Sequence, residues 1–246
     1  MKKIVTLSAL LLLFAGWLIS YPCLMRWYEG FSCFSTLPDF VVLHFHFPED
    51  IFRYLGSFLL QFYAYPVAAA LIQAALPVLA VLIFRGIINR LFKDASSLFW
   101  VSFLPLPYYV YLQLDDMTLA KFCMILTFTA LLYGISWFVS LFFRADNPLP
   151  AVVRKPWLSV VIPALSVFTS LYILLDGPLS SQHEAIARLE YHGECQDWGE
   201  IIKEVTPGDA LQNEYKRKYV LLALSETGQL PDYAFRYGLS SPDDFC

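Results

Sequence analysis

Long apolar stretches alternate with short charged connections over most of this chain. A helix needs about 20 consecutive apolar residues to cross the hydrocarbon core of a bilayer. Five stretches meet that requirement, and we expect a transmembrane helix in each of them: 4–24, 66–84, 96–114, 119–143 and 157–175. Pro105 and Pro107 lie inside the third stretch. They are interpreted as kinks, because neighbouring helices satisfy the carbonyl groups that a proline leaves free.

The connection between the first two stretches, residues 25–65, has apolar and aromatic parts of its own. Its second half repeats apolar residues at helical spacing, with polar residues on another face. The apolar positions are Phe52, Leu55, Phe58, Leu59 and Phe62, and the polar ones are Arg53, Ser57 and Gln61. This pattern predicts an amphipathic helix that lies in the membrane interface, started by Pro48 and by the acids Glu49 and Asp50 in its first turn.

The pattern changes near Asp176, where long apolar stretches give way to short amphipathic ones. We expect four helices there, over 181–194, 198–205, 211–227 and 230–237. Ser181 and Asp197 each stand three residues before a glutamate, which is a capping-box pattern, and Pro207-Gly208 is expected to end the second helix. The third helix is predicted to turn Tyr215, Tyr219, Leu222 and Ala223 inward.

Together these patterns predict an all-α protein with two domains. Residues 1–176 form a polytopic membrane helical bundle of five transmembrane helices plus the interfacial helix, and residues 177–246 form a small soluble domain. Its two successive helical hairpins resemble tetratricopeptide-type repeats. Such hairpins bury one face on each other and need a neighbour to bury the other.

Composition supports a membrane protein and excludes one class of partner. The chain is 58% hydrophobic and 15% charged, whereas soluble domains are about one quarter charged. The net charge of −4 excludes a nucleic-acid partner, because phosphate binding needs clustered Lys and Arg. Residues 177–246 hold 12 acidic residues against 6 basic ones, so the acidity is concentrated in the soluble domain.

The basic residues of the connections predict the orientation. With the N-terminus in the cytoplasm, the connections on that side hold eight Lys and Arg residues, and those on the opposite side hold three, Arg26, Arg53 and Lys121. This distribution follows the positive-inside rule. Five crossings then place residues 177–246 outside the cytoplasm.

Candidate chemistry is concentrated in residues 25–65. Asp39, Glu49 and Asp50 face the same compartment as Asp115 and Asp116, so carboxylates from two connections could converge as a general base or on a divalent ion. His44 and His46 are weak candidates for metal ligands beside them. The alternative is that Glu49 and Asp50 cap the interfacial helix and that the histidines only lie at the membrane surface. The sequence leaves the cofactor unknown, and it leaves open whether Cys23 and Cys33 are bridged.

Several phrases of the sequence resemble a known family. They are YPCLMRWYEGFSCF (21–34), YLGSFLLQFYAYP (54–66), DWGEIIKEV (197–205) and YVLLALSETGQLPDYAFRY (219–237). The chain resembles an uncharacterised, domain-of-unknown-function family of bacterial multi-pass inner-membrane proteins with a C-terminal tetratricopeptide-like helical region. The resemblance implies a bacterial inner membrane, a periplasmic C-terminus and no particular activity. Members are about twice as long, so this chain is expected to be a shortened member.

Two functions remain open. The first is a membrane-anchored scaffold whose residues 177–246 bind an envelope protein, and the lack of a convincing catalytic set favours it over an enzyme. The second rests on a looser similarity to multi-span glycosyltransferases that use a polyprenyl-linked sugar donor. That similarity implies an acid of the first outer connection, Asp39, Glu49 or Asp50, as the base. The first hypothesis predicts a protein partner, and the second predicts a catalytic carboxylate.

Overall fold

The computed structural model describes residues 2–30, 32, 34–37, 45–47, 49–93, 95–115, 117–143, 155, 157–176 and 178–238. The chain divides into two compact units, Met1–Pro178 and Leu179–Cys246, which are considered one at a time. All the regular elements of the described residues are helical. Cys33, Asp39, His44 and Asp116 lie outside the described residues, and so does the question of a bridge between Cys23 and Cys33.

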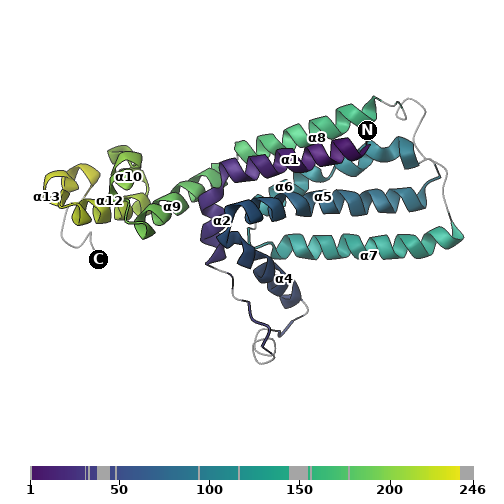
Figure 1. Ribbon diagram of the computed structural model, residues 1–246, viewed down its shortest axis with the longest axis horizontal. Coiled ribbons are helices and arrows are strands. Elements are labelled where there is room, and N and C mark those ends of the chain that lie inside the picture. Colours follow the sequence, from purple (N-terminus) through teal and green to yellow (C-terminus); the bar gives the residue numbers. More distant parts are fainter. Residues whose placement is uncertain are drawn as a thin grey trace. The chain divides into compact units, whose positions relative to one another are not determined.

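The N-terminal unit is a bundle of long helices with shorter helices at one end (Figure 1). Its elements are α1 (Lys2–Ser20), α2 (Pro22–Glu29), α4 (Asp50–Leu60), the 3₁₀ helix η1 (Gln61–Ala64), α5 (Pro66–Leu91), the 3₁₀ helix η2 (Ala95–Phe103), α6 (Leu106–Asp115), α7 (Ala120–Phe142) and α8 (Leu158–Leu175).

Four helices in the described residues are long and apolar enough to cross a membrane: α1, α5, α7 and α8. They fall on four of the five predicted stretches. The first is shorter than expected and ends at Ser20, because Pro22 begins α2 instead of continuing α1. Many of their apolar side chains point out of the bundle, among them Ile4, Phe128 and Phe168 at 67%, 60% and 69% exposure. A lipid environment suits such a surface, whereas water does not.

The third predicted stretch, 96–114, is not one continuous helix. It consists of η2 and α6, which are separated at Leu104 and Pro105. Pro105 and Pro107 cannot donate backbone hydrogen bonds, and a residue before a proline avoids the α conformation, so the helix restarts here instead of bending. Nine residues of 3₁₀ helix and ten of α-helix span roughly 33 Å at rises of about 2.0 and 1.5 Å per residue.

Close contacts fix the helices of this bundle to one another. Gly16 of α1 faces α8, and a Cβ atom at Gly16 would lie 2.6 Å from Leu174 Cδ2. The buried Tyr21 hydroxyl donates a hydrogen bond to the Leu174 carbonyl oxygen at 2.6 Å. Gln113 of α6 donates to the Gln73 carbonyl of α5 at 3.0 Å, and both glutamines are fully buried.

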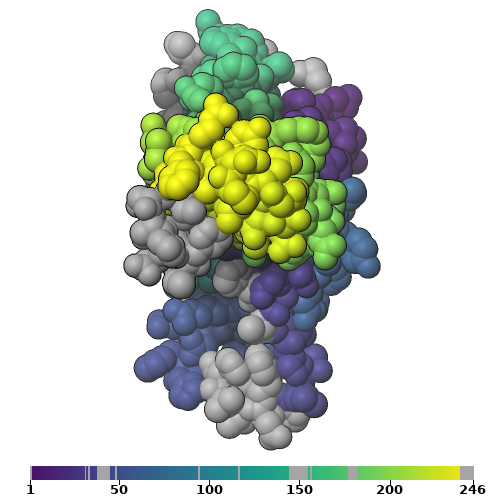
Figure 2. Space-filling view, turned by 90° about the vertical axis from the view of Figure 1, so that its left-hand side faces the viewer, coloured from purple at the N-terminus to yellow at the C-terminus, as the bar shows by residue number. Residues whose placement is uncertain are grey.

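As far as residue 238, where the described part of the chain ends, the C-terminal unit consists of six helices around one core. They are α9 (Pro178–Glu194), α10 (Trp198–Glu204), α11 (Pro207–Gln212), α12 (Glu214–Glu226), α13 (Leu230–Tyr233) and η4 (Ala234–Tyr237). The core is Leu189, Ile201, Val205, Ala210, Val220, Leu221, Ala223, Leu224, Ala234 and Tyr237. Figure 2 shows the surface of this unit, coloured green to yellow.

Three sequence-based expectations are wrong in this unit. Asp197 makes no capping hydrogen bond; the capping box is instead formed by Thr206 and Asp209 at the start of α11. Pro207 was expected to end the second helix, but α10 already ends at Glu204. Pro207 is instead the first residue of α11, where its missing N–H is not needed. The predicted helix 211–227 is interrupted by Asn213, whose side chain accepts hydrogen bonds from the first backbone N–H groups of α12.

The fourth difference concerns the face that α12 buries. Ala223 is buried as predicted, and Tyr219 packs against the core. Tyr215 and Leu222, however, are 64% and 44% exposed. The core positions are taken by Val220, Leu221 and Leu224, because α10 and α11 pack on that side of α12.

Candidate functional site at helix α4

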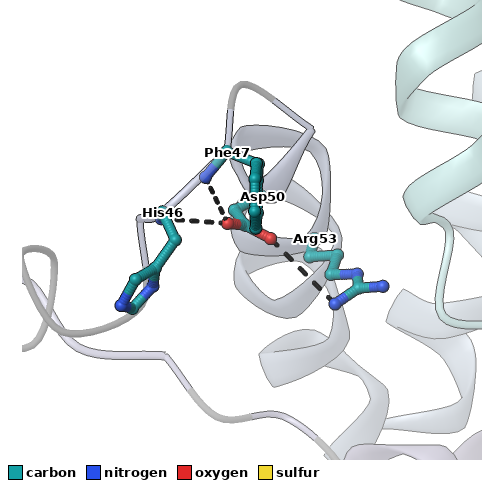
Figure 3. Close-up of polar contacts among 4 residues, drawn as sticks. All are labelled: His46, Phe47, Asp50 and Arg53. Carbon is teal, nitrogen blue, oxygen red and sulfur yellow. Dashed lines mark hydrogen bonds and ion pairs between the residues drawn. The ribbon is translucent and has the colours of Figure 1, made fainter.

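Asp50 organises the start of α4 (Figure 3). Its Oδ2 atom accepts hydrogen bonds from the backbone N–H groups of His46 and Phe47, at 3.0 and 2.8 Å. Its Oδ1 atom lies 4.0 Å from the guanidinium of Arg53, one turn later. The carboxylate therefore closes the turn that leads into the helix, as one of the two sequence interpretations proposed.

These contacts set the protonation of Asp50. The hydrogen bond from the Phe47 N–H lowers the pKa of the Asp50 carboxyl most, followed by the one from His46, and the charge of Arg53 acts in the same direction. Each contact favours the charged form. A carboxylate with a lowered pKa is a weaker proton acceptor, so this position suits a structural anchor better than a general base.

Glu49 and His46 are exposed on either side of this turn. Glu49 stands at the position before α4 and makes no capping hydrogen bond with its side chain. The His46 imidazole points away from the Asp50 carboxylate in Figure 3. Within the described residues no group of three or more His, Cys, Asp or Glu side chains is arranged to hold a metal ion. The metal and catalytic roles of these residues remain predictions.

Helix α4 is amphipathic, as its sequence predicts. Gly56 and Leu60, followed by Tyr63 of η1, are buried against the bundle. The opposite face carries apolar side chains that are 40–45% exposed: Ile51, Leu55, Phe58 and Phe62. A helix with one face on the bundle and a second apolar face open to its surroundings suits the boundary between lipid and water.

The connection between α6 and α7 packs directly on α4. A Cβ atom at Gly56 would overlap the Thr118 carbonyl oxygen, so only glycine permits this approach. The next residue, Leu119, has a left-handed backbone with φ 63° although it is not glycine. Such a conformation costs roughly 1–3 kcal/mol, and the complete burial of the Leu119 side chain offsets it.

A cleft of about 480 Å³ lies between α4 and this connection. Its lining comes from α4, the end of α6, the α6–α7 connection and the first turn of α7, and consists of Arg53, Ser57, Leu60, Asp115, Thr118, Ala120 and Lys121. Lys121 Nζ and Asp115 Oδ2 form an ion pair at 2.8 Å. The volume falls in the range of small-molecule sites, about 300–1,000 Å³.

The cleft differs from the predicted meeting of carboxylates. Asp115 is the one described acid in its lining, and Arg53 and Lys121 contribute two cations. Sequence reasoning missed Ser57, Thr118 and Lys121 as site residues. The sequence held one signal for this site. Arg53 and Ser57 are four residues apart, so they lie on one side of the helix, and the nearby Gly56 leaves room for another backbone to approach.

Buried polar contacts with α5 hold the α6–α7 connection, which forms one wall of the cleft. Gln73 Nε2 of α5 lies 3.8 Å from the Met117 sulfur, in the α6–α7 connection. The Gln73 carbonyl accepts the hydrogen bond from Gln113 at the end of α6. These contacts fix both ends of the connection that carries Thr118.

Comparison with known proteins supports the family assignment. No curated protein and no solved structure matches the chain. The sequence profile described as "Family of unknown function (DUF6057)" matches residues 1–178, which is more than half of the chain. The chain therefore belongs to this family of unknown function.

Proposed function

We propose that this protein is a membrane-anchored interaction protein whose C-terminal helical unit binds a protein partner. The observation that carries the proposal is the outer face of α12. Tyr215 and Leu222 lie two turns apart on one side of the helix and are largely exposed, although the core of the unit is complete without them. Covering such side chains is favourable by about 25 cal/mol per Å² of apolar surface, and tyrosine is a common anchor in interfaces.

We further propose that the N-terminal unit crosses the membrane five times, with η2 and α6 as a broken third crossing. The directions of the helices support this count. The first turns of α1 and α8 line one groove through Ile4 and Val160, and their last turns meet at Gly16 and Leu174, so α1 and α8 run parallel. Successive crossings of a membrane alternate in direction, so two parallel helices must have an odd number of crossings between them. Between α1 and α8, the helices α5 and α7 make two crossings, so η2–α6 supplies the third.

The ends of η2–α6 support the same proposal. Near its start, the Lys2 ammonium of α1 donates a hydrogen bond to the Ser96 carbonyl oxygen at 2.9 Å. At its end, Asp115 lies in the cleft beside α4. Five crossings and the excess of Lys and Arg on the N-terminal side together favour a C-terminal unit outside the cytoplasm, in the periplasm if the cell is bacterial.

Site-specific photocrosslinking in native membranes tests the interaction. A photoreactive amino acid is placed at position 215 or 222 of the full chain, with position 203 on the exposed side of α10 as the control. We expect a discrete crosslinked species from 215 and 222 and none from 203. Tyr215→Ala should reduce crosslinking from position 222 while the thermal unfolding of the protein stays unchanged. Equal crosslinking from all three positions would contradict the proposal.

A second candidate is an enzyme of the multi-span glycosyltransferase type, and the cleft beside α4 is the observation that favours it. The cleft combines two cations, hydroxyl groups and a carboxylate, which suits a phosphate-linked sugar donor. Under this proposal Asp39, Glu49 or Asp50 supplies the base, and Asn or Gln in its place abolishes activity. If all three single variants restore a deletion strain fully, the enzyme proposal fails. The interaction proposal is unaffected by that result.

A further inference from the structure

Two cations converge on one aromatic ring at the end of the N-terminal unit where α1 begins. The Lys2 ammonium lies 5.6 Å from the centroid of the Phe99 ring, and the Arg85 guanidinium lies 5.0 Å from it. Lys2 comes from α1, Arg85 from α5 and Phe99 from η2. Three elements that are distant in sequence therefore bring two positive charges to one place.

The ring attracts each cation, but it does not remove their mutual repulsion. Among the described residues neither Lys2 nor Arg85 forms an ion pair with a carboxylate. Arg90, near the end of α5, behaves differently. Its guanidinium donates a hydrogen bond to the Tyr133 hydroxyl at 2.6 Å and lies 4.1 Å from the centre of that ring. The Lys2 ammonium gives one of its three hydrogens to the Ser96 carbonyl, so Lys2 and Arg85 still offer charge and donors to an anion, whereas Arg90 is held against the Tyr133 ring and hydroxyl.

An apolar groove of about 340 Å³ begins next to this pair. It runs between α1 and α8, and its lining starts at Ile4 and Val5, within one turn of Lys2. Farther along, Ala164 and Phe168 of α8 form the opposite wall. Pro163 interrupts the hydrogen bonding of α8 beside the groove.

We propose that Lys2 and Arg85 bind the phosphate of an anionic membrane lipid, and that one acyl chain of the same lipid lies in the groove between α1 and α8. The arrangement matches the two parts of such a lipid: charge at the helix ends, and an apolar channel that starts there and follows two helices long and apolar enough to cross a membrane. Basic pockets between transmembrane helices bind phosphate head groups in this way. The inference is independent of what the C-terminal unit binds.

The test uses the full chain in nanodiscs of phosphatidylcholine with a titrated fraction of phosphatidylglycerol, and native mass spectrometry counts the lipids that are retained. Each cation near the surface contributes about fivefold in affinity, so Lys2→Gln with Arg85→Gln should weaken phosphatidylglycerol retention about thirtyfold. Lys3→Gln is the matched control for the single variant Lys2→Gln, which should weaken retention about fivefold, because Lys3→Gln removes the same single charge from the exposed neighbouring position. We expect Lys3→Gln to retain the lipid like the unmodified protein.

Two further arms separate a lipid from a soluble phosphate compound. Ala164→Phe fills the groove and should lower phosphatidylglycerol retention while the cation pair is intact. Inorganic phosphate at millimolar concentration should compete poorly with the lipid. The proposal is overturned if the double variant retains the lipid normally, or if Lys3→Gln loses it equally. It is also overturned if free phosphate displaces the lipid and Ala164→Phe has no effect.

Discussion

The orientation of α12 predicts very different losses of stability when two leucines that are two residues apart are each changed to alanine. Leu224 is 1% exposed and belongs to the core of the C-terminal unit, whereas Leu222 is 44% exposed. Leu224→Ala leaves a cavity and costs about 3 kcal/mol, near the lower part of the range for buried leucines. Leu222→Ala removes the same atoms from the surface and costs about 0.5 kcal/mol or less.

Because the C-terminal unit is small, the difference between these two free-energy costs has a large effect on the fraction of folded protein. A domain of this size has a free energy of unfolding of about 4 kcal/mol. Losing about 3 kcal/mol raises the unfolded fraction from about 0.1% to roughly 15%. With a dependence on urea of about 1 kcal/mol per molar, the midpoint falls by about 3 M in Leu224→Ala and by less than about 0.5 M in Leu222→Ala.

Pulse proteolysis of the full chain in nanodiscs, followed through a C-terminal tag, measures this midpoint for the C-terminal unit. The two variants carry the same substitution on the same helix, so differences in helix propensity or in the unfolded state cancel. The reasoning is refuted if Leu222→Ala shifts the midpoint as much as Leu224→Ala, because α12 would then bury the face that contains Leu222.

Two more predictions concern the α6–α7 connection and pH. Gly56→Ala should destabilise the N-terminal unit by about 1–3 kcal/mol, because the new Cβ overlaps the Thr118 carbonyl. Gly134→Ala has open space around it and should stabilise the unit by about 0.5–1 kcal/mol. Thermal unfolding in detergent compares the two variants. The Thr206 hydroxyl lowers the pKa of Asp209, so this carboxylate stabilises the C-terminal unit above the ordinary pKa of aspartate. That stability is lost as the pH falls from about 4 through the lowered native value. In Thr206→Val, urea midpoints measured between pH 6 and 3 should lose part of this dependence.

The apolar stretches predicted the long helices well because a helix that lies in lipid must satisfy all its backbone groups itself. Length and hydropathy then determine the element with little help from neighbours. The third stretch shows the limit of that reasoning. Pro105 was visible in the sequence, but hydropathy alone does not distinguish a kinked α-helix from a 3₁₀ helix followed by a new α-helix.

The C-terminal unit was harder to predict because its third predicted helix is apolar on more than one side. From Tyr219 to Leu224 six consecutive residues are apolar, so two different faces fit a helical period. Contacts with α10 and α11 select one of them, and those contacts depend on the break at Asn213. Asparagine is common at helix starts and also on exposed helix surfaces, so the hydrogen bonds of Asn213 decide between the two.

The candidate site was predictable where it depends on local chemistry. Pro48, Glu49 and Asp50 indicated the start of a helix, and Asp50 does bond the turn before it. The cleft itself brings α4, with Arg53, together with residues 115–121, which lie more than 60 positions later in the sequence. No spacing in the sequence shows that the Thr118 carbonyl lies on Gly56, so only the tertiary structure shows that Arg53 and Lys121 line the same cleft.

The topology proposal rests on two independent kinds of observation. The distribution of Lys and Arg concerns the charge of the connections, and the parallel course of α1 and α8 concerns their packing. The packing of α5 on α7 is a second observation of the packing kind: Ala80 and Phe122 belong to one cluster, and Gly86 meets Tyr133 farther along, so these helices also run parallel. Four crossings would make each of these pairs antiparallel. A broken helix of 3₁₀ and α segments is therefore the element on which the location of the C-terminal unit depends.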